Sequence, residues 1–306
     1  MNGPMLRAPV LRLTEASWFR RLATGRLGWR VASRFVAGDT LDAAIETARA
    51  LDRRKAATIL DHLGENVVAP EHASEALAAY LRAIDRVSAE PSLDVAISVK
   101  LTQLGLDFSN ELAIANLERV VDAAGGRLVM IDMESSVYVD RTLQVFHALR
   151  ARSDRIGIAL QSYLHRTPRD VDRLPAGSIV RMVKGAYLEP SEVAIQDRKG
   201  VDRAFASLTA TCLARGHTVH VATHDPELLE GTRAFVERGG IPWSRVELQF
   251  LLGVRRDLQT RYAEEGYPVR VYVPYGAEWY PYLTRRLAER PANMWFFLSN
   301  LVRVRR

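Results

Sequence analysis

The sequence predicts an α/β protein built around a single (β/α)8 barrel of the TIM type. Eight short apolar runs follow one another along the chain, each bounded by turn residues and most followed by an amphipathic stretch of helical period. Their starts lie roughly 23 to 40 residues apart, an interval that suits one strand plus one helix. Eight such units are the number that closes a parallel barrel.

The apolar runs give the expected strands directly. In chain order they are residues 57–60, 95–101, 128–133, 156–161, 179–183, 219–223, 246–251 and 269–273. Between them, segments such as 111–124 and 204–215 place apolar residues at helical spacing. A doubly wound open sheet is the main alternative, but it would usually carry a G-x-G-x-x-G turn after its first strand. No such turn follows residues 57–60, which favours the barrel.

Residues 1–45 are expected to form an N-terminal helical segment, and residues 46–306 the barrel. The first stretch mixes apolar and basic residues without the alternation of a strand. Gly38-Asp39-Thr40 then offers a turn and a helix cap directly before Leu41. Because barrels of this kind run to about 250 residues as one domain, 306 residues fit one barrel with a short appendage.

The charge balance indicates a solvated basic surface. The chain has 42 Lys and Arg against 36 Asp and Glu, a formal net charge of +6, with the excess near both termini. The arginines do not alternate with aromatic residues on a recognisable nucleic-acid module, so we expect no nucleic-acid partner. Weak attraction to an anionic membrane surface stays open as an alternative.

Cysteine usage and hydropathy predict a cytoplasmic protein. The single cysteine, Cys212, cannot form an internal disulfide, which fits a reducing compartment. No apolar run approaches the roughly eighteen residues of a membrane-spanning helix, and the N-terminus lacks the pattern of a signal peptide. A peripheral position at the inner face of the cell membrane is a further option.

Polar residues stand at the carboxyl end of every predicted strand, where barrels of this kind build their active sites. In strand order they are Asp61, Lys100, Asp132 with Glu134, Gln161, Arg181 with Lys184, Thr223 with His224 and Asp225, Gln249, and Tyr272. Each has a structural alternative: Asp61 or Asp225 could cap the next helix, and Lys184 could pair with Asp132. Taken together, they indicate a polar ligand over the barrel mouth.

Two classes of chemistry are disfavoured by the absence of their motifs. The seven histidines are scattered without H-E-x-x-H or comparable spacing, so we expect no metal site. No G-x-S-x-G elbow is present, which makes a Ser-His-Asp hydrolase a poor fit.

A last helix is predicted over residues 278–290, after the turn Pro274-Tyr275-Gly276 and before Pro291. Helical spacing places four polar side chains on one side of it: Tyr282, Arg285, Arg286 and Glu289. Paired arginines bind a carboxylate through planar bidentate contacts, and a glutamate accepts hydrogen bonds from a cationic amine, so the set matches an amino acid. The structural alternative is a surface helix with an ordinary pair between residues 285 and 289.

Four separate segments in this order resemble the proline dehydrogenase family. They are residues 61–65 (DHLGE), 181–187 (RMVKGAY), 222–225 (ATHD) and 282–289 (YLTRRLAE), and the similarity runs from about residue 35 to the end. The resemblance implies a (β/α)8 barrel with its final helix over the mouth and non-covalent FAD at the strand ends. It also implies oxidation of L-proline to Δ1-pyrroline-5-carboxylate, the first step of catabolism to glutamate, with electrons passed to a membrane quinone. A separate pyrroline-5-carboxylate dehydrogenase is a further expected partner.

The family motifs also imply roles for individual residues. The catalytic residues would be Lys100, Asp132, Tyr272, Arg285, Arg286 and Glu289, and the proline site would add Tyr187 and Leu251. The FAD contacts would be Gln161, Arg181, Lys184, Gly185, Ala186, Thr223, His224 and Gln249, with Arg181 near the flavin N5. The sequence departs from the family pattern at Asp225, where some members have asparagine, and at Tyr275, where a smaller residue is common.

Two other functions stay open on the sequence. Another flavin barrel, such as a folate reductase, would bind a larger aromatic substrate and usually a nicotinamide donor. A flavin- or amino-acid-binding module without turnover, for example one that senses proline, is the second alternative.

Overall fold

The structure, a computed structural model, describes residues 29, 32–64 and 67–289, with side chains of the last helix described as far as Thr284. Eight parallel strands pair in chain order, and the last strand pairs with the first, so the sheet is a closed barrel. This closure confirms the predicted fold class and excludes the doubly wound open sheet.

The strands lie close to their predicted positions. They are β1 (Ala57–His62), β2 (Val95–Val99), β3 (Val129–Ile131), β4 (Ile156–Gln161), β5 (Ile179–Val183), β6 (Thr218–Ala222), β7 (Val246–Leu251) and β8 (Val269–Tyr275). β2 ends before the predicted residue 101, because the chain turns at Lys100 while Leu101 and Leu104 continue the apolar pattern as buried turn residues. β8 runs on to Tyr275, because its end pairs with His62 of β1.

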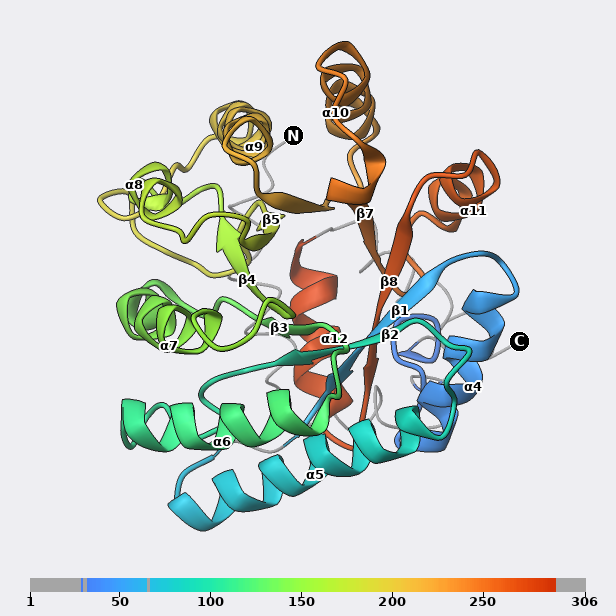
Figure 1. Ribbon diagram of the computed structural model, residues 1–306, viewed down its shortest axis with the longest axis vertical. Coiled ribbons are helices and arrows are strands. Elements are labelled where there is room, and N and C mark those ends of the chain that lie inside the picture. The colour runs from blue at the N-terminus through green and yellow to red at the C-terminus, as the bar shows by residue number, and fades with distance from the viewer. Residues whose placement is uncertain (1–28, 30–31, 65–66, 290–306) are drawn as a thin grey trace, which may run out of the picture.

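Helices alternate with the strands and surround the barrel (Figure 1). They are α4 (Leu41–Asp52), α5 (Pro70–Ser88), α6 (Asn110–Ala123), α7 (Val139–Arg150), α8 (Thr167–Asp172), α9 (Arg198–Ala214), α10 (Pro226–Arg238), α11 (Arg256–Glu264) and α12 (Trp279–Glu289), with short 3-10 turns η1 (Ser136–Tyr138) and η2 (Trp243–Arg245). The predicted cap before Leu41 is present, since Thr40 Oγ1 accepts a hydrogen bond from Ala43 N at 3.3 Å. α4 runs across the boundary drawn at residue 45, and most of the N-terminal segment 1–45 lies outside the described residues.

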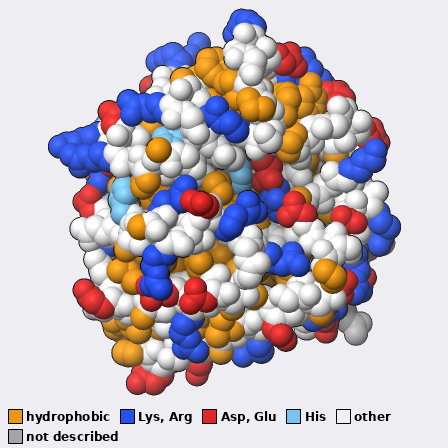
Figure 2. Space-filling model, in the orientation of Figure 1, with side chains coloured by type: hydrophobic (Ala, Val, Ile, Leu, Met, Phe, Trp, Pro, Cys, Tyr) orange, Lys and Arg blue, Asp and Glu red, His pale blue; other side chains and the backbone are white. Residues whose placement is uncertain are grey.

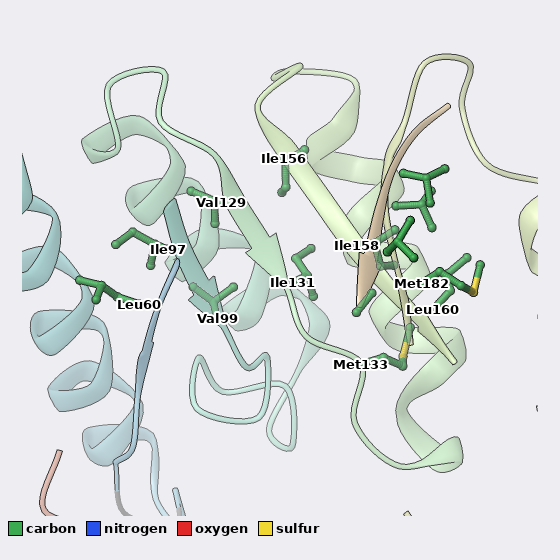
Figure 3. Packing of buried hydrophobic residues seen from close by; sticks show 14 of the residues in the cluster. Leu60, Ile97, Val99, Val129, Ile131, Met133, Ile156, Ile158, Leu160 and Met182 are labelled. Carbon is green, nitrogen blue, oxygen red and sulfur yellow. The ribbon is translucent and has the colours of Figure 1, made fainter. Parts of the chain in front are cut away.

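Alternation along the strands divides the interior into two layers. Side chains that point outward are apolar and pack under the helices, as in Figure 3, where Ile97 and Val99 of β2 lie beside Val129 and Ile131 of β3. A small inner apolar cluster includes Ile59, Ala96, Leu128, Met130 and Ile179. Several other inward positions carry buried polar side chains, among them Ser98, Arg181, His220 and Arg270, so the barrel lumen contains a polar core.

The last helix, α12, begins just beyond the carboxyl end of β8. Gly276 makes the turn at φ +127°, and its N–H donates to the carbonyl of Gly38 at 2.9 Å. In Figure 1 the helix lies at the centre of the view, inside the ring of outer helices. Trp279, Tyr282 and Leu283 are buried, so the first turns pack onto the barrel rather than into solvent. The predicted helix over the mouth is therefore present.

The surface carries both signs of charge. Figure 2 shows basic and acidic side chains interspersed over one face of the molecule. In the part of the chain that the structure describes, no helix is long and apolar enough to cross a membrane.

Candidate active site

Asp132, the first residue after β3, is the centre of a polar cluster at the carboxyl ends of the strands. Its Oδ1 accepts hydrogen bonds from Ser98 Oγ at 2.8 Å and from Arg181 Nη1 at 2.6 Å, and its Oδ2 accepts one from Tyr272 Oη at 2.8 Å. Burial opposes the charged form, but Arg181 and Lys100 hold the pKa of Asp132 below its ordinary value. The carboxylate is therefore ionised and fully engaged near neutral pH.

Lys100 lies between two carboxylates. Its Nζ forms an ion pair with Asp61 and lies 3.6 Å from Asp132 Oδ2. Burial works against the ammonium, but Asp61 and Asp132 raise its pKa above the ordinary lysine value, so it remains a cation. Asp61 does not cap the next helix, whose N-cap is Ala69; the capping alternative is wrong because this carboxylate points into the barrel toward Lys100.

Arg181 comes from the middle of β5 and is only 4% exposed. Its Nε donates to Gln249 Oε1 at 2.8 Å and its Nη1 to Ser98 Oγ at 3.2 Å, in addition to the bond to Asp132. The guanidinium also lies 5.4 Å from the centre of the Tyr272 ring. Among the residues that the structure describes, none accepts a hydrogen bond from its buried Nη2.

Lys184 and Asp225 form a neighbouring cluster at the ends of β5 and β6. Lys184 Nζ pairs with Asp202 and lies 3.2 Å from Asp225 Oδ2, so the alternative pairing with Asp132 is wrong: Arg181 occupies that carboxylate instead. Asp225 is the N-cap of α10, as the capping alternative predicts, and accepts from Glu227 N at 3.1 Å. Burial opposes its charge, but Lys184 lowers the pKa of Asp225.

Backbone geometry after β5 requires glycine. Gly185 has φ +122°, and a Cβ at this position would overlap the ring of Tyr163. The following residues, Ala186 and Tyr187, are half-buried on the same loop. The glycine therefore lets the backbone lie directly against the Tyr163 ring.

The other predicted contacts also gather at this end of the barrel. Gln161 Nε2 donates to the carbonyl of Glu134 at 2.8 Å, and burial raises the pKa of Glu134. His224 Nε2 accepts from the backbone N–H of Leu251 at 3.0 Å, which fixes the imidazole at the end of β7. Thr223 Oγ1 accepts from Asp225 N at 3.3 Å.

The side chains of Arg285, Arg286 and Glu289 lie outside the described residues, although the α12 backbone that carries them is described. Their predicted roles stay predictions.

Four inward-facing polar residues were missed at the sequence level: Ser98, His220, Glu247 and Arg270. A signal for three of them was present. Ser98, Glu247 and Arg270 each stand two residues before a residue that the strand-end pattern selects, namely Lys100, Gln249 and Tyr272. Residues two apart on a strand share a face, so the same rule extends each polar end one step into the barrel.

These features define a (β/α)8-barrel enzyme whose site is a cluster of two carboxylates and two cations at the carboxyl ends of the strands. The family model described as proline dehydrogenase matches residues 44–298. The chain therefore belongs to the proline dehydrogenase family, a family of flavoenzymes, and its activity is the oxidation of proline.

Full-length relatives and solved structures agree with this assignment. The chain is 37% identical over 305 residues to proline dehydrogenase 1 of Bacillus subtilis (strain 168), covering 98% of this chain and 100% of that protein. It is 37% identical over 313 residues to proline dehydrogenase of Deinococcus radiodurans, covering 99% and 100%. A crystal structure of proline utilization A from Bdellovibrio bacteriovorus, inactivated by N-propargylglycine, superposes with a TM-score of 0.78 at 24% identity. That match covers 85% of this chain but only 32% of the longer one, and it shows the fold.

Proposed function

We propose that the chain oxidises L-proline to Δ1-pyrroline-5-carboxylate with non-covalently bound FAD and passes the electrons to a membrane quinone. This reaction is the first step of proline catabolism to glutamate. The product would then go to a separate pyrroline-5-carboxylate dehydrogenase.

The observation that carries the proposal is the buried guanidinium of Arg181. A buried donor of a charged group is costly without a partner, and no described residue accepts from Nη2 of Arg181. An acceptor atom of a bound ligand would satisfy it, and the resemblance to the family implies a position near the flavin N5 for this arginine. When bound, FAD supplies the hydride acceptor that the oxidation of an amine requires.

The surrounding residues fit such a cofactor. The Gly185 backbone packs directly on the Tyr163 ring at the end of β5, and Lys184 offers a cation beside it. Gln161 ends β4, and Thr223 and His224 directly follow β6; these two strands flank β5. We assign these residues, with Ala186 and Gln249, to the cofactor site.

The substrate site is proposed on the other side of Asp132. Lys100, Asp132 and Tyr272 form its floor, and Tyr187 and Leu251 would pack against the proline ring. Arg285 and Arg286 of α12 would hold the carboxylate through bidentate contacts, and Glu289 would hold the ring amine. Because the amine must lose its proton before hydride can leave, a lysine that stays cationic favours the neutral amine.

The test is an anaerobic titration of the purified chain. The visible spectrum is expected to show bound flavin, and L-proline is expected to bleach the flavin bands while NADH is not. Bleaching by NADH alone would favour a folate reductase-like flavin barrel. A yellow protein that L-proline fails to bleach would contradict the proposal in favour of a binding module.

A pair of variants ties the bleaching to the site. Arg181→Lys keeps the charge but loses the planar fork, and we expect the rate of bleaching to fall by about tenfold or more. The matched control is Arg215→Lys. Arg215 is an exposed arginine directly after α9 and forms an ion pair with Asp172. Equal bleaching rates in the two variants would show that Arg181 has no role in the reduction of the flavin by proline.

A further inference from the structure

Polar contacts continue into the barrel below Arg181, away from the mouth. Gln249 of β7 accepts from Arg181 Nε through its Oε1 at 2.8 Å. Its amide nitrogen Nε2 lies 2.7 Å from Glu247 Oε1 and 2.9 Å from His220 Nδ1. Gln249 is 3% exposed, so these three neighbours account for its whole amide.

The charges at the two ends of this amide fix its orientation. A carboxylate accepts only, so the atom that faces Glu247 must be the amide nitrogen. A guanidinium donates only, so the atom that faces Arg181 must be the amide oxygen. A flipped amide would oppose oxygen to the carboxylate and N–H to the guanidinium.

The second amide proton then determines the state of His220. It points at Nδ1, which must be an unprotonated acceptor, so the imidazole is neutral with its proton on Nε2. The charged groups that face His220 are Glu247 on β7, Arg270 on β8, Arg181 on β5, and Arg155 before β4. Burial is the largest cause that lowers the pKa of His220, to about 4, which agrees with the neutral ring.

Glu247 is itself anchored from below. Arg270 Nε donates to its two carboxylate oxygens at 2.9 and 3.0 Å. Arg270 also donates to the carbonyl of Thr58 at 2.8 Å and to Asp94 at 3.1 and 3.0 Å. Charges therefore alternate along the barrel from Asp94 at its base to Asp61 at its mouth.

We propose that His220 and Glu247 are positioning residues for the oxidation of proline. Together they hold the amide of Gln249 in the one orientation that anchors Nε of Arg181, which leaves Nη2 of Arg181 available to a ligand. Among the described residues, their hydrogen bonds toward the Arg181 cluster run to Gln249 and not to Asp132 or Lys100. The inference rests on the proposed role of Arg181 and names two further residues on the neighbouring strands β6 and β7.

A measurement on the unmodified protein tests the geometry without turnover. In flavin-loaded protein with nitrogen-15 histidine, NMR at pH 7 should show His220 Nδ1 as the unprotonated nitrogen and Nε2 as the protonated one. Assignment uses the resonance that disappears in His220→Asn. A protonated Nδ1 would overturn the proposal whether or not the enzyme oxidises proline.

Variants at position 220 test the consequence for catalysis. Asparagine can present Oδ1 where imidazole presents Nδ1, whereas leucine offers no acceptor. We expect His220→Leu to lower kcat about tenfold, the effect of one lost hydrogen bond in a chain to a charged group, with KM for proline within about twofold. His220→Asn should restore kcat to within about twofold of wild type. Glu247→Leu, which also removes an acceptor from Gln249, should behave like the leucine variant at position 220.

The matched control is His217→Leu, which replaces another buried histidine just before β6 that makes no hydrogen bond to Gln249. It should leave kcat unchanged. The proposal fails if His220→Leu matches this control, if the asparagine and leucine variants lose kcat equally, or if the loss appears in KM instead. Turnover of proline by the wild-type protein, measured first, separates these outcomes from failure of the proposed function.

Discussion

Arg181 receives its partners from several strands at once. Ser98 of β2, Asp132 after β3 and Gln249 of β7 bind its guanidinium, and Tyr272 of β8 lies beneath it. A change of rotamer would break bonds to three different strands. The guanidinium is therefore preorganised, with the cost of ordering it met during folding rather than when a ligand binds.

Gly185 is the residue at which a single methyl group should do most damage near the site. A Cβ would overlap the buried ring of Tyr163, and φ +122° is strained for any other residue. We expect Gly185→Ala to lower the free energy of unfolding by about 2 to 4 kcal/mol, through overpacking added to backbone strain. Denaturant unfolding and the flavin content of the purified protein measure the effect.

Gly216→Ala serves as the control for backbone strain alone. Gly216 also has a positive φ, +88°, but a Cβ there would meet nothing within 4 Å. This variant should cost only about 1 kcal/mol and should keep full flavin content. If the free energy of unfolding falls equally in the two variants, the overlap with Tyr163 contributes nothing to the loss at Gly185.

At the scale of elements, hydrophobic runs predicted the strands because each strand buries an apolar outer face under helices. The mouth residues were predictable for a related reason: a barrel gathers the residues at its strand ends, so Asp132 and Tyr272 meet although 140 positions separate them. Partner choice was not predictable. Asp132 pairs with Arg181 rather than Lys184 because the register between strands, which no local pattern encodes, sets those distances.

The inner polar layer escaped prediction because its residues stand inside apolar runs. His220 lies between Val219 and Val221, and its neighbours alone suggest a buried strand. Only the strand period, counted back from the polar end, places Glu247 and Arg270 on the inner face. A search restricted to the strand ends therefore finds the polar residues at the barrel mouth and misses the inner polar residues that contact them.

The turn between β8 and α12 sets where the last helix sits over the mouth. A Cβ at Gly276 would lie 2.6 Å from the carbonyl oxygen of Leu63, a backbone atom that cannot move aside cheaply. Gly276→Ala should therefore shift the start of α12 away from β1. Since the proposed carboxylate clamp is on this helix, we expect KM for proline to rise about tenfold, an effect of about 1.4 kcal/mol.

The control for this turn is Gly266→Ala, which precedes β8 at the opposite end of the barrel. Gly266 has φ +86°, and a Cβ there would meet nothing within 4 Å. Its KM should equal that of wild type. A Gly276→Ala enzyme with unchanged KM would indicate that α12 is not positioned by this turn, or that it does not hold the substrate.

For the whole molecule, an ion-paired lumen inside an apolar shell makes stability depend on pH. Buried charges stay favourable only while their partners keep the matching charge. Arg270 and Glu247 keep theirs over a wide range: burial opposes both charges, but their mutual attraction raises the pKa of Arg270 and lowers that of Glu247. Of Arg270, Glu247 and His220, His220 has the pKa nearest to neutral pH.

Acidification should therefore destabilise the fold through His220 before it protonates the neighbouring Glu247. The pKa of His220 falls from 6.5 in the unfolded chain to about 4 in the folded one, so between these values the unfolded state binds the additional proton. The contribution of His220 to the free energy of unfolding is fully present above about pH 6.5 and declines as pH falls toward 4, by about 2 to 3 kcal/mol.

Urea unfolding at pH 7.5 and pH 4.5 should show this loss in wild type and a smaller one in His220→Asn, which has no imidazole to protonate. His217→Asn should retain the part of the loss that arises from His220, because His220 is unchanged in that variant. Equal losses in all three proteins would mean that the pH dependence arises elsewhere in the barrel.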